Sequence, residues 1–191
     1  MKSVLRFFGK RMPASGEVRA VFSVVVFAVY SWSIRGFLFN TSSFLMYHSL
    51  SFIAAIFFYM MAFALLESVL VTGFLVIVSM ILPAGWFRIG FAYKGFLVIL
   101  VAAIGMIEFQ SYYTIDFVGN MMNNDYSFMQ PILIGLIISI AALGGLLLLF
   151  GKVNRLQRLL VALVEKFAIF DYVYLPLGLL GFVAVVIRNL F

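Results

Sequence analysis

Long apolar runs, separated by short polar or basic stretches, make up most of the chain. Five of these runs are long enough to cross a bilayer as helices, because about 20 residues suffice. We expect these crossings at residues 20–39, 64–83, 95–112, 131–151 and 172–187. The runs are continuous rather than alternating, which excludes the strands of a membrane β-barrel. The pattern therefore predicts an all-α polytopic integral membrane protein that forms a single domain over residues 1–191.

Two further segments are amphipathic instead of uniformly apolar. In residues 1–13, Lys2, Arg6 and Lys10 lie four residues apart on one helical stripe, and Pro13 ends the segment. In residues 152–170 the charged side chains share one helical face, and leucines cover the other. Both segments predict helices on the cytoplasmic membrane surface. Docking of residues 152–170 onto a partner subunit remains an alternative.

The longest run, Phe52 to Leu82, has thirty-one residues and one charge, Glu67. As a helix it would be roughly 46 Å long, and fitting it into a core of about 30 Å would require an unusually steep tilt. We therefore expect residues 64–83 to cross. Residues 44–63 would lie along the outer interface or re-enter the membrane, with a bend near Glu67; one long kinked helix is the alternative. The polar residues 40–43 predict a turn before this run.

Basic residues indicate the topology. With one crossing in the long run and a cytoplasmic N-terminus, eleven Lys and Arg face the cytoplasm and two face outside. Splitting the run at Glu67 into two crossings gives six inside and seven outside. Cytoplasmic loops carry the excess of Lys and Arg. The charges therefore predict a plasma (inner) membrane protein with its N-terminus in the cytoplasm and its C-terminus outside.

Composition agrees with a membrane location and narrows the partners. Only 10% of residues are charged, whereas soluble domains have about 25%. The net charge of +6 gathers beside the apolar runs, which favours contact with anionic lipid and argues against nucleic acid. Small residues in the uncharged run 131–151, beginning with Gly135 and Ser139, suit close helix packing. We expect the lipid bilayer as a partner, together with other membrane subunits or further copies of the chain.

Three charged residues within or beside the spans are the candidate site. On the predicted threading Arg35, Glu67 and Glu108 all lie in the outer third of the membrane. Ionisable groups are costly there, and each is a candidate for function. We expect a polar cluster, either a structural ion pair that fixes helix packing or a relay for protons or ions.

Catalytic patterns are missing from the sequence. It has one histidine and no cysteine, and no motif for a metal site, a nucleophile or a phosphate loop occurs. We therefore predict no catalytic residue and no metal site, and no cofactor can be assigned. The first hypothesis is a non-catalytic subunit or accessory protein of a larger membrane complex. The alternatives are a small transporter or channel component using the charged cluster, and a lipid-processing enzyme using His48 or Asp116.

Overall fold

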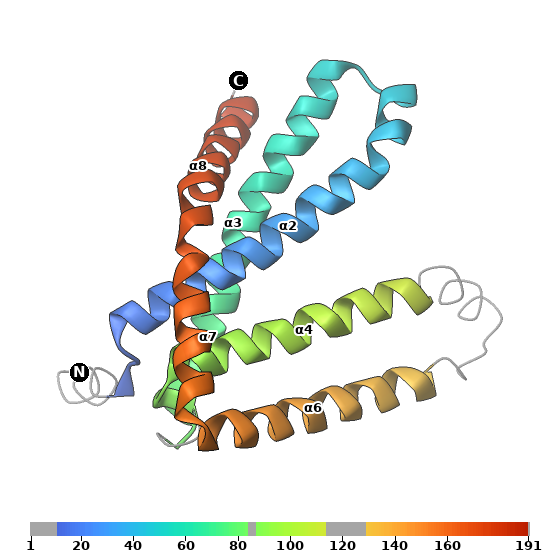
Figure 1. Cartoon of the computed structure of the whole chain (residues 1–191). Coiled ribbons are helices and arrows are strands. Elements are labelled where there is room, and N and C mark those ends of the chain that lie inside the picture. The colour runs from blue at the N-terminus through green and yellow to red at the C-terminus, as the bar shows by residue number, and fades with distance from the viewer. Residues whose placement is uncertain (1–10, 84–86, 114–128, 191) are drawn as a thin grey trace. The chain divides into compact units, whose positions relative to one another are not determined.

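Helices make up nearly all of the part of the chain that the structure, a computed structural model, describes: residues 11–83, 87–113 and 129–190 (Figure 1). They are α2 (Ser15–Tyr47), α3 (Leu50–Ile81), α4 (Phe91–Tyr113), α6 (Met129–Lys152), α7 (Asn154–Lys166) and α8 (Ala168–Leu190). Five helices in these described ranges are long and apolar enough to cross a membrane, α7 and α8 counting together as one. The structure thus confirms the all-α fold expected from the apolar runs, with five helices long and apolar enough to cross a membrane among the described residues.

Two predictions from the sequence concern residues that lie largely outside the described ranges. The helix expected over residues 1–13 is described only from Arg11 onward, and Asp116 lies in the range 114–128 that is not described. The chain divides into two compact units, residues 1–92 with 161–191 and residues 93–160.

In the first unit α2 and α3 form an antiparallel hairpin. The turn expected at residues 40–43 is wrong, because α2 continues through them to Tyr47. Asn40 donates to the Gly36 carbonyl at 2.8 Å and Thr41 to the Phe37 carbonyl at 2.9 Å, so these polar side chains bond to the helix that they would otherwise interrupt. The chain turns instead at His48, whose ring packs 4.5 Å from that of Phe52.

Helix α3 runs without interruption through Glu67 and Ser68. Ser68 is fully buried and donates to the Ala64 carbonyl at 2.7 Å, which satisfies its hydroxyl within the helix. Residues 50–63 are therefore the first part of one 32-residue helix. Their position relative to a membrane remains a prediction.

Helix α8 completes the first unit by packing against both helices of the hairpin (Figure 1). The core of this unit contains the fully buried Tyr30 of α2 and Met61 of α3, and the Tyr30 ring stacks on that of Tyr174 at 5.0 Å. Glycines make the contact close. A Cβ atom at Gly181 would lie 2.9 Å from the backbone nitrogen of Ala62 and would also collide with the Phe58 carbonyl oxygen. The α8 backbone therefore lies directly against that of α3.

The far end of this packing is closed by polar side chains. The Arg188 guanidinium lies over the rings of Phe52 and Tyr59, at 5.9 and 5.7 Å from their centroids. Asn189 donates to the Tyr59 hydroxyl at 3.1 Å. This end of the α3–α8 contact is thus held by polar side chains as well as by the apolar core.

The second unit contains α6 and most of α4. The two helices approach at Gly105, where an added Cβ would lie 3.9 Å from the Ser139 hydroxyl. Ser139 therefore faces α4 inside the chain. At the other end of α6, Gln157 donates to the Phe150 carbonyl at 2.8 Å and so satisfies one of the last carbonyls of that helix.

Helix α7 is amphipathic, as the sequence predicts. Val164 is fully buried, while Leu159 and Leu163 on the same apolar face are 66% and 44% exposed. Its charged residues Arg155, Arg158, Glu165 and Lys166 are exposed. Apolar side chains of α7 thus remain uncovered beside its charged residues, and its position at a membrane surface stays a prediction.

Candidate functional site

The three charged residues singled out from the sequence are on three different helices, one of them in the second unit. Arg35 is exposed on α2, and its guanidinium lies 5.3 Å from the centroid of the Trp32 ring. Glu67 is exposed on α3, and Glu108 is exposed on α4 in the second unit. A shared cluster of the three residues stays a prediction.

Helix register gives the spacing of Arg35 and Glu67 in the first unit. Tyr30 and Leu65 lie at one level of the antiparallel hairpin, because both approach Gly178. From that level Arg35 lies five residues toward the turn, and Glu67 lies two residues the other way. Their backbone levels therefore differ by roughly 10 Å.

A second polar site, not singled out from the sequence, is buried in the first unit. Ser23 of α2 is fully buried and Asp171 of α8 is 8% exposed. The Ser23 hydroxyl donates to Asp171 Oδ2 at 2.6 Å, the length of a hydroxyl-to-carboxylate hydrogen bond. This bond joins residues 148 positions apart in the sequence and ties α2 to the first turn of α8.

Register adds a third residue to this site. Moving two helical turns, seven residues, from the level of Tyr30, Leu65 and Gly178 leads to Ser23, Thr72 and Asp171 on the three helices. Thr72 is 6% exposed, so its side chain points into the unit. We call these three residues the buried polar level.

Two oxygens of the buried polar level have no hydrogen-bond partner among the described residues, Thr72 Oγ1 and Asp171 Oδ1. Buried polar atoms are normally paired, and a buried carboxylate normally has a cation or several donors close by. The Ser23 hydroxyl has one hydrogen, with the Arg19 carbonyl at 3.1 Å as its other acceptor. Each of these two oxygens could therefore bond to a proton, a small cation or a water molecule.

Reasoning from the sequence missed this level for identifiable reasons. Asp171 begins a span next to a basic helix, where a charged residue is unremarkable, and Ser23 and Thr72 are small hydroxyl residues that many spans contain. The usable signal was that Ser23 and Thr72 interrupt valine- and leucine-rich stretches on helices that pack together.

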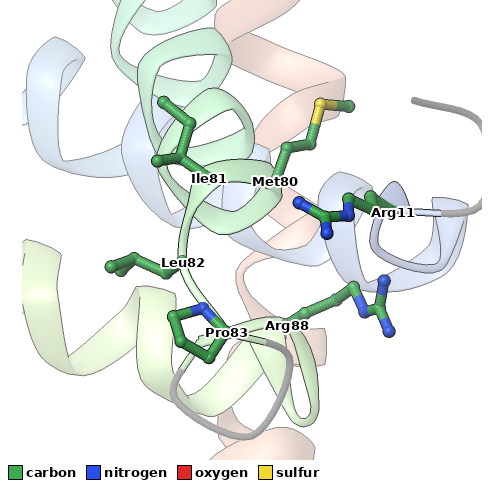
Figure 2. A pocket seen from close by; sticks show the side chains of 6 residues that line it. All are labelled: Arg11, Met80, Ile81, Leu82, Pro83 and Arg88. Carbon is green, nitrogen blue, oxygen red and sulfur yellow. The ribbon is translucent and has the colours of Figure 1, made fainter. Parts of the chain in front are cut away.

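A cavity of about 370 Å³ lies where α2 begins and α3 ends. The described residues that line it are four apolar ones and two arginines: Met80, Ile81, Leu82, Pro83, Arg11 and Arg88. Figure 2 shows both guanidinium groups on one side of the backbone that carries Leu82, and the Leu82 side chain on the other side. Antiparallel packing explains the meeting, since it brings the start of α2 to the end of α3. Gly90, in the left-handed conformation with φ of 72°, then turns the chain into α4.

His48, a further candidate residue from the sequence, is exposed and does not belong to either of these two sites. His48 lies in the hairpin turn between the rings of Phe44 and Phe52. The described residues contain no group of three or more His, Cys, Asp or Glu side chains that would hold a metal ion. The chain matches no protein-family model, no curated protein and no solved structure.

Proposed function

We propose that the chain is a non-catalytic integral membrane subunit or accessory protein of a larger membrane assembly. In this proposal the five long helices cross a plasma membrane, α7 lies on its cytoplasmic surface, and the N-terminus is cytoplasmic. Eleven cytoplasmic Lys and Arg against two outside support that orientation. The observation that carries the proposal is the outward face of α6.

The half-buried residues of α6 are separated by seven, four, three and four positions and so lie along one side of the helix: Ile132, Ser139, Leu143, Leu146 and Phe150, with the half-buried Leu147 beside them. The opposite side of the helix carries an equally regular exposed stripe: Ile134, Ile138, Ala141, Gly145 and Leu148. Ala141 and Gly145 are four residues apart, and an added Cβ at Gly145 would meet nothing within 4 Å. This side of α6 therefore has the small-residue spacing that lets a second helix approach closely.

Glycines elsewhere in the chain support this interpretation. In α8, Gly178 and Gly181 are buried where the helix meets its neighbours, and an added Cβ would collide with them. In the middle of α6, Gly144 and Gly145 have no such neighbour among the described residues. A glycine inside a helix costs about 1 kcal/mol relative to alanine. A partner helix on the outward face, from another subunit or a second copy of the chain, would supply a compensating contact.

Purification from native membranes in mild detergent, followed by native mass spectrometry, tests the proposal. We expect a complex of fixed stoichiometry that the double variant Ala141→Leu, Gly145→Leu disrupts. Ile138→Leu, on the same face and of equal volume, is the matched control and should leave the complex intact. A wild-type chain that runs as a monomer, or a complex that tolerates both leucines, would refute the proposal.

The buried polar level favours a second candidate function, a small transporter or channel component for protons or ions. The sequence points to Arg35, Glu67 and Glu108 as the polar groups of such a pathway. Asp171 is the better-placed carboxyl, because it is buried and one of its oxygens has no partner among the described residues. Glu67 is exposed.

Flux measurements in proteoliposomes distinguish the two sets of residues. If Asp171 carries the pathway, Asp171→Asn abolishes proton or sodium flux and Glu67→Gln leaves it intact. The opposite result would assign the pathway to the cluster predicted from the sequence. No flux in the wild-type protein would exclude the transport function and leave the subunit proposal unaffected.

A further inference from the structure

We propose that the cavity at the start of α2 and the end of α3 binds the phosphate headgroup of an anionic phospholipid. The site consists of Arg11 and Arg88, with an apolar wall from Met80 to Pro83. Its volume of about 370 Å³ falls within the range of small-ligand pockets, about 300–1,000 Å³.

The charged residues that line the cavity indicate the sign of the ligand's charge. The charged side chains among the described lining residues are both arginines. The end of α3 contributes the negative pole of a helix, about half an elementary charge, and two guanidinium groups exceed it roughly fourfold. Each guanidinium has five donors in a planar fork that matches phosphate oxygens, so bonds to neighbouring groups still leave donors for a ligand. The cavity therefore selects an anion, and phosphate suits its donors.

The apolar surface next to the cavity distinguishes a lipid from a soluble anion. From Ile81 at its rim, a stripe of exposed residues continues along α3 through Ile77 and Phe74 to Leu70, each three or four positions from the last. These side chains are 56% to 73% exposed. The stripe is roughly 16 Å long, about half of a 30 Å hydrocarbon core. A lipid whose phosphate lies between the arginines would thus place an acyl chain along one leaflet's length of α3.

The position of the cavity along the helices agrees with this occupant. It lies at the last turn of α3 and the two residues that follow, where a long apolar helix ends and its connecting residues begin. On the predicted threading this level is the cytoplasmic interface, where anionic lipids attract basic residues. The inference does not depend on the proposed subunit function, since a lipid site is compatible with either candidate function.

Native mass spectrometry of the full chain, purified in detergent and mixed with phosphatidylglycerol or phosphatidylcholine, tests the proposal. We expect the wild type to bind phosphatidylglycerol tightly. The double variant Arg11→Gln, Arg88→Gln should bind it more weakly, by about tenfold for each arginine replaced. The control Arg155→Gln, Arg158→Gln removes the same charge from α7 and should bind as the wild type does. Equal loss in both double variants, or no loss in the first, would overturn the proposal.

Two further measurements complete the test. Inorganic phosphate should not displace the bound lipid at millimolar concentration; displacement would mark a site for soluble anions and overturn the lipid assignment. Because the double variant risks misfolding, a photoactivatable phosphatidylglycerol is also crosslinked to the wild type. Labels on Met80, Ile81 or Leu82 support the site, and labels confined to other segments contradict it.

Discussion

The close contact between α8 and α3 predicts that replacing two different glycines by alanine changes the stability of the protein in opposite directions. At Gly181, an added Cβ would lie 2.9 Å from the Ala62 nitrogen and 3.3 Å from Met61 Cβ, and closer still to the Phe58 carbonyl oxygen. Two of these atoms belong to the backbone of α3 and cannot rotate away. Gly181→Ala therefore forces the two helices apart.

The magnitude follows from two opposing effects. Overpacking costs about 1–3 kcal/mol, and contact with backbone atoms places this site at the upper end. Alanine regains about 1 kcal/mol of helix propensity. The net loss is about 2 kcal/mol, which in a chain of 191 residues lowers the unfolding midpoint by roughly 4–8 °C.

Gly73 of α3 is the matched control, because an added Cβ there would meet nothing within 4 Å. Gly73→Ala should gain the helix propensity alone and raise the midpoint by roughly 2–4 °C. Thermal unfolding in detergent micelles, followed by far-ultraviolet circular dichroism, measures both variants. If Gly181→Ala stabilises the protein as much as Gly73→Ala does, the close approach of α8 to α3 is refuted.

Three further predictions concern side chains of the first unit, each measured by the same unfolding assay. Ser23→Ala leaves Asp171 Oδ2 without its donor and should lower the free energy of unfolding by about 1–3 kcal/mol. In a double-mutant cycle with Asp171→Asn, the two losses of stability should be non-additive by at least about 0.5 kcal/mol. Additive losses would exclude the bond. Tyr30→Phe removes the hydrogen bond to the Met61 carbonyl at 3.2 Å and should cost about 1 kcal/mol, so an unchanged midpoint would contradict that bond. Arg188→Gln removes two cation–π contacts and should cost about 1 kcal/mol in total, whereas Arg188→Lys should retain part of it; equal losses would show that charge is irrelevant there.

The sequence was sufficient for the number of long helices and for the amphipathic character of α7, because both depend on local patterns of apolar residues. It was insufficient for helix ends inside apolar stretches. Residues 40–43 are polar enough to predict a turn, yet Asn40 and Thr41 bond to carbonyls one turn earlier and the helix continues. Residues 50–63 have no periodicity that would distinguish a separate surface helix from the first half of α3.

The candidate sites were harder to predict, since each depends on contacts between distant segments. Glu67 stood out because it is the one charge in a long apolar run, but on the assembled helices it is exposed. Asp171 gains its interest only from its bond to Ser23 in another helix. The arginine cavity likewise requires that the start of α2 meets the end of α3. Single residues are visible in a sequence, whereas their neighbours across helices are not.

The first unit has a consequence for synthesis, because its two parts are separated by residues 93–160. At 5–20 residues per second, a ribosome needs roughly 3 to 14 s to make those 68 residues. During that interval the α2–α3 hairpin is complete, but α8, which covers Met61 and supplies Asp171, does not yet exist. Until α8 is made, the Ser23 hydroxyl has the Arg19 carbonyl but not the Asp171 carboxylate as an acceptor. Helix order along the chain therefore differs from packing order, because α8 closes the first unit only after the whole second unit has been made.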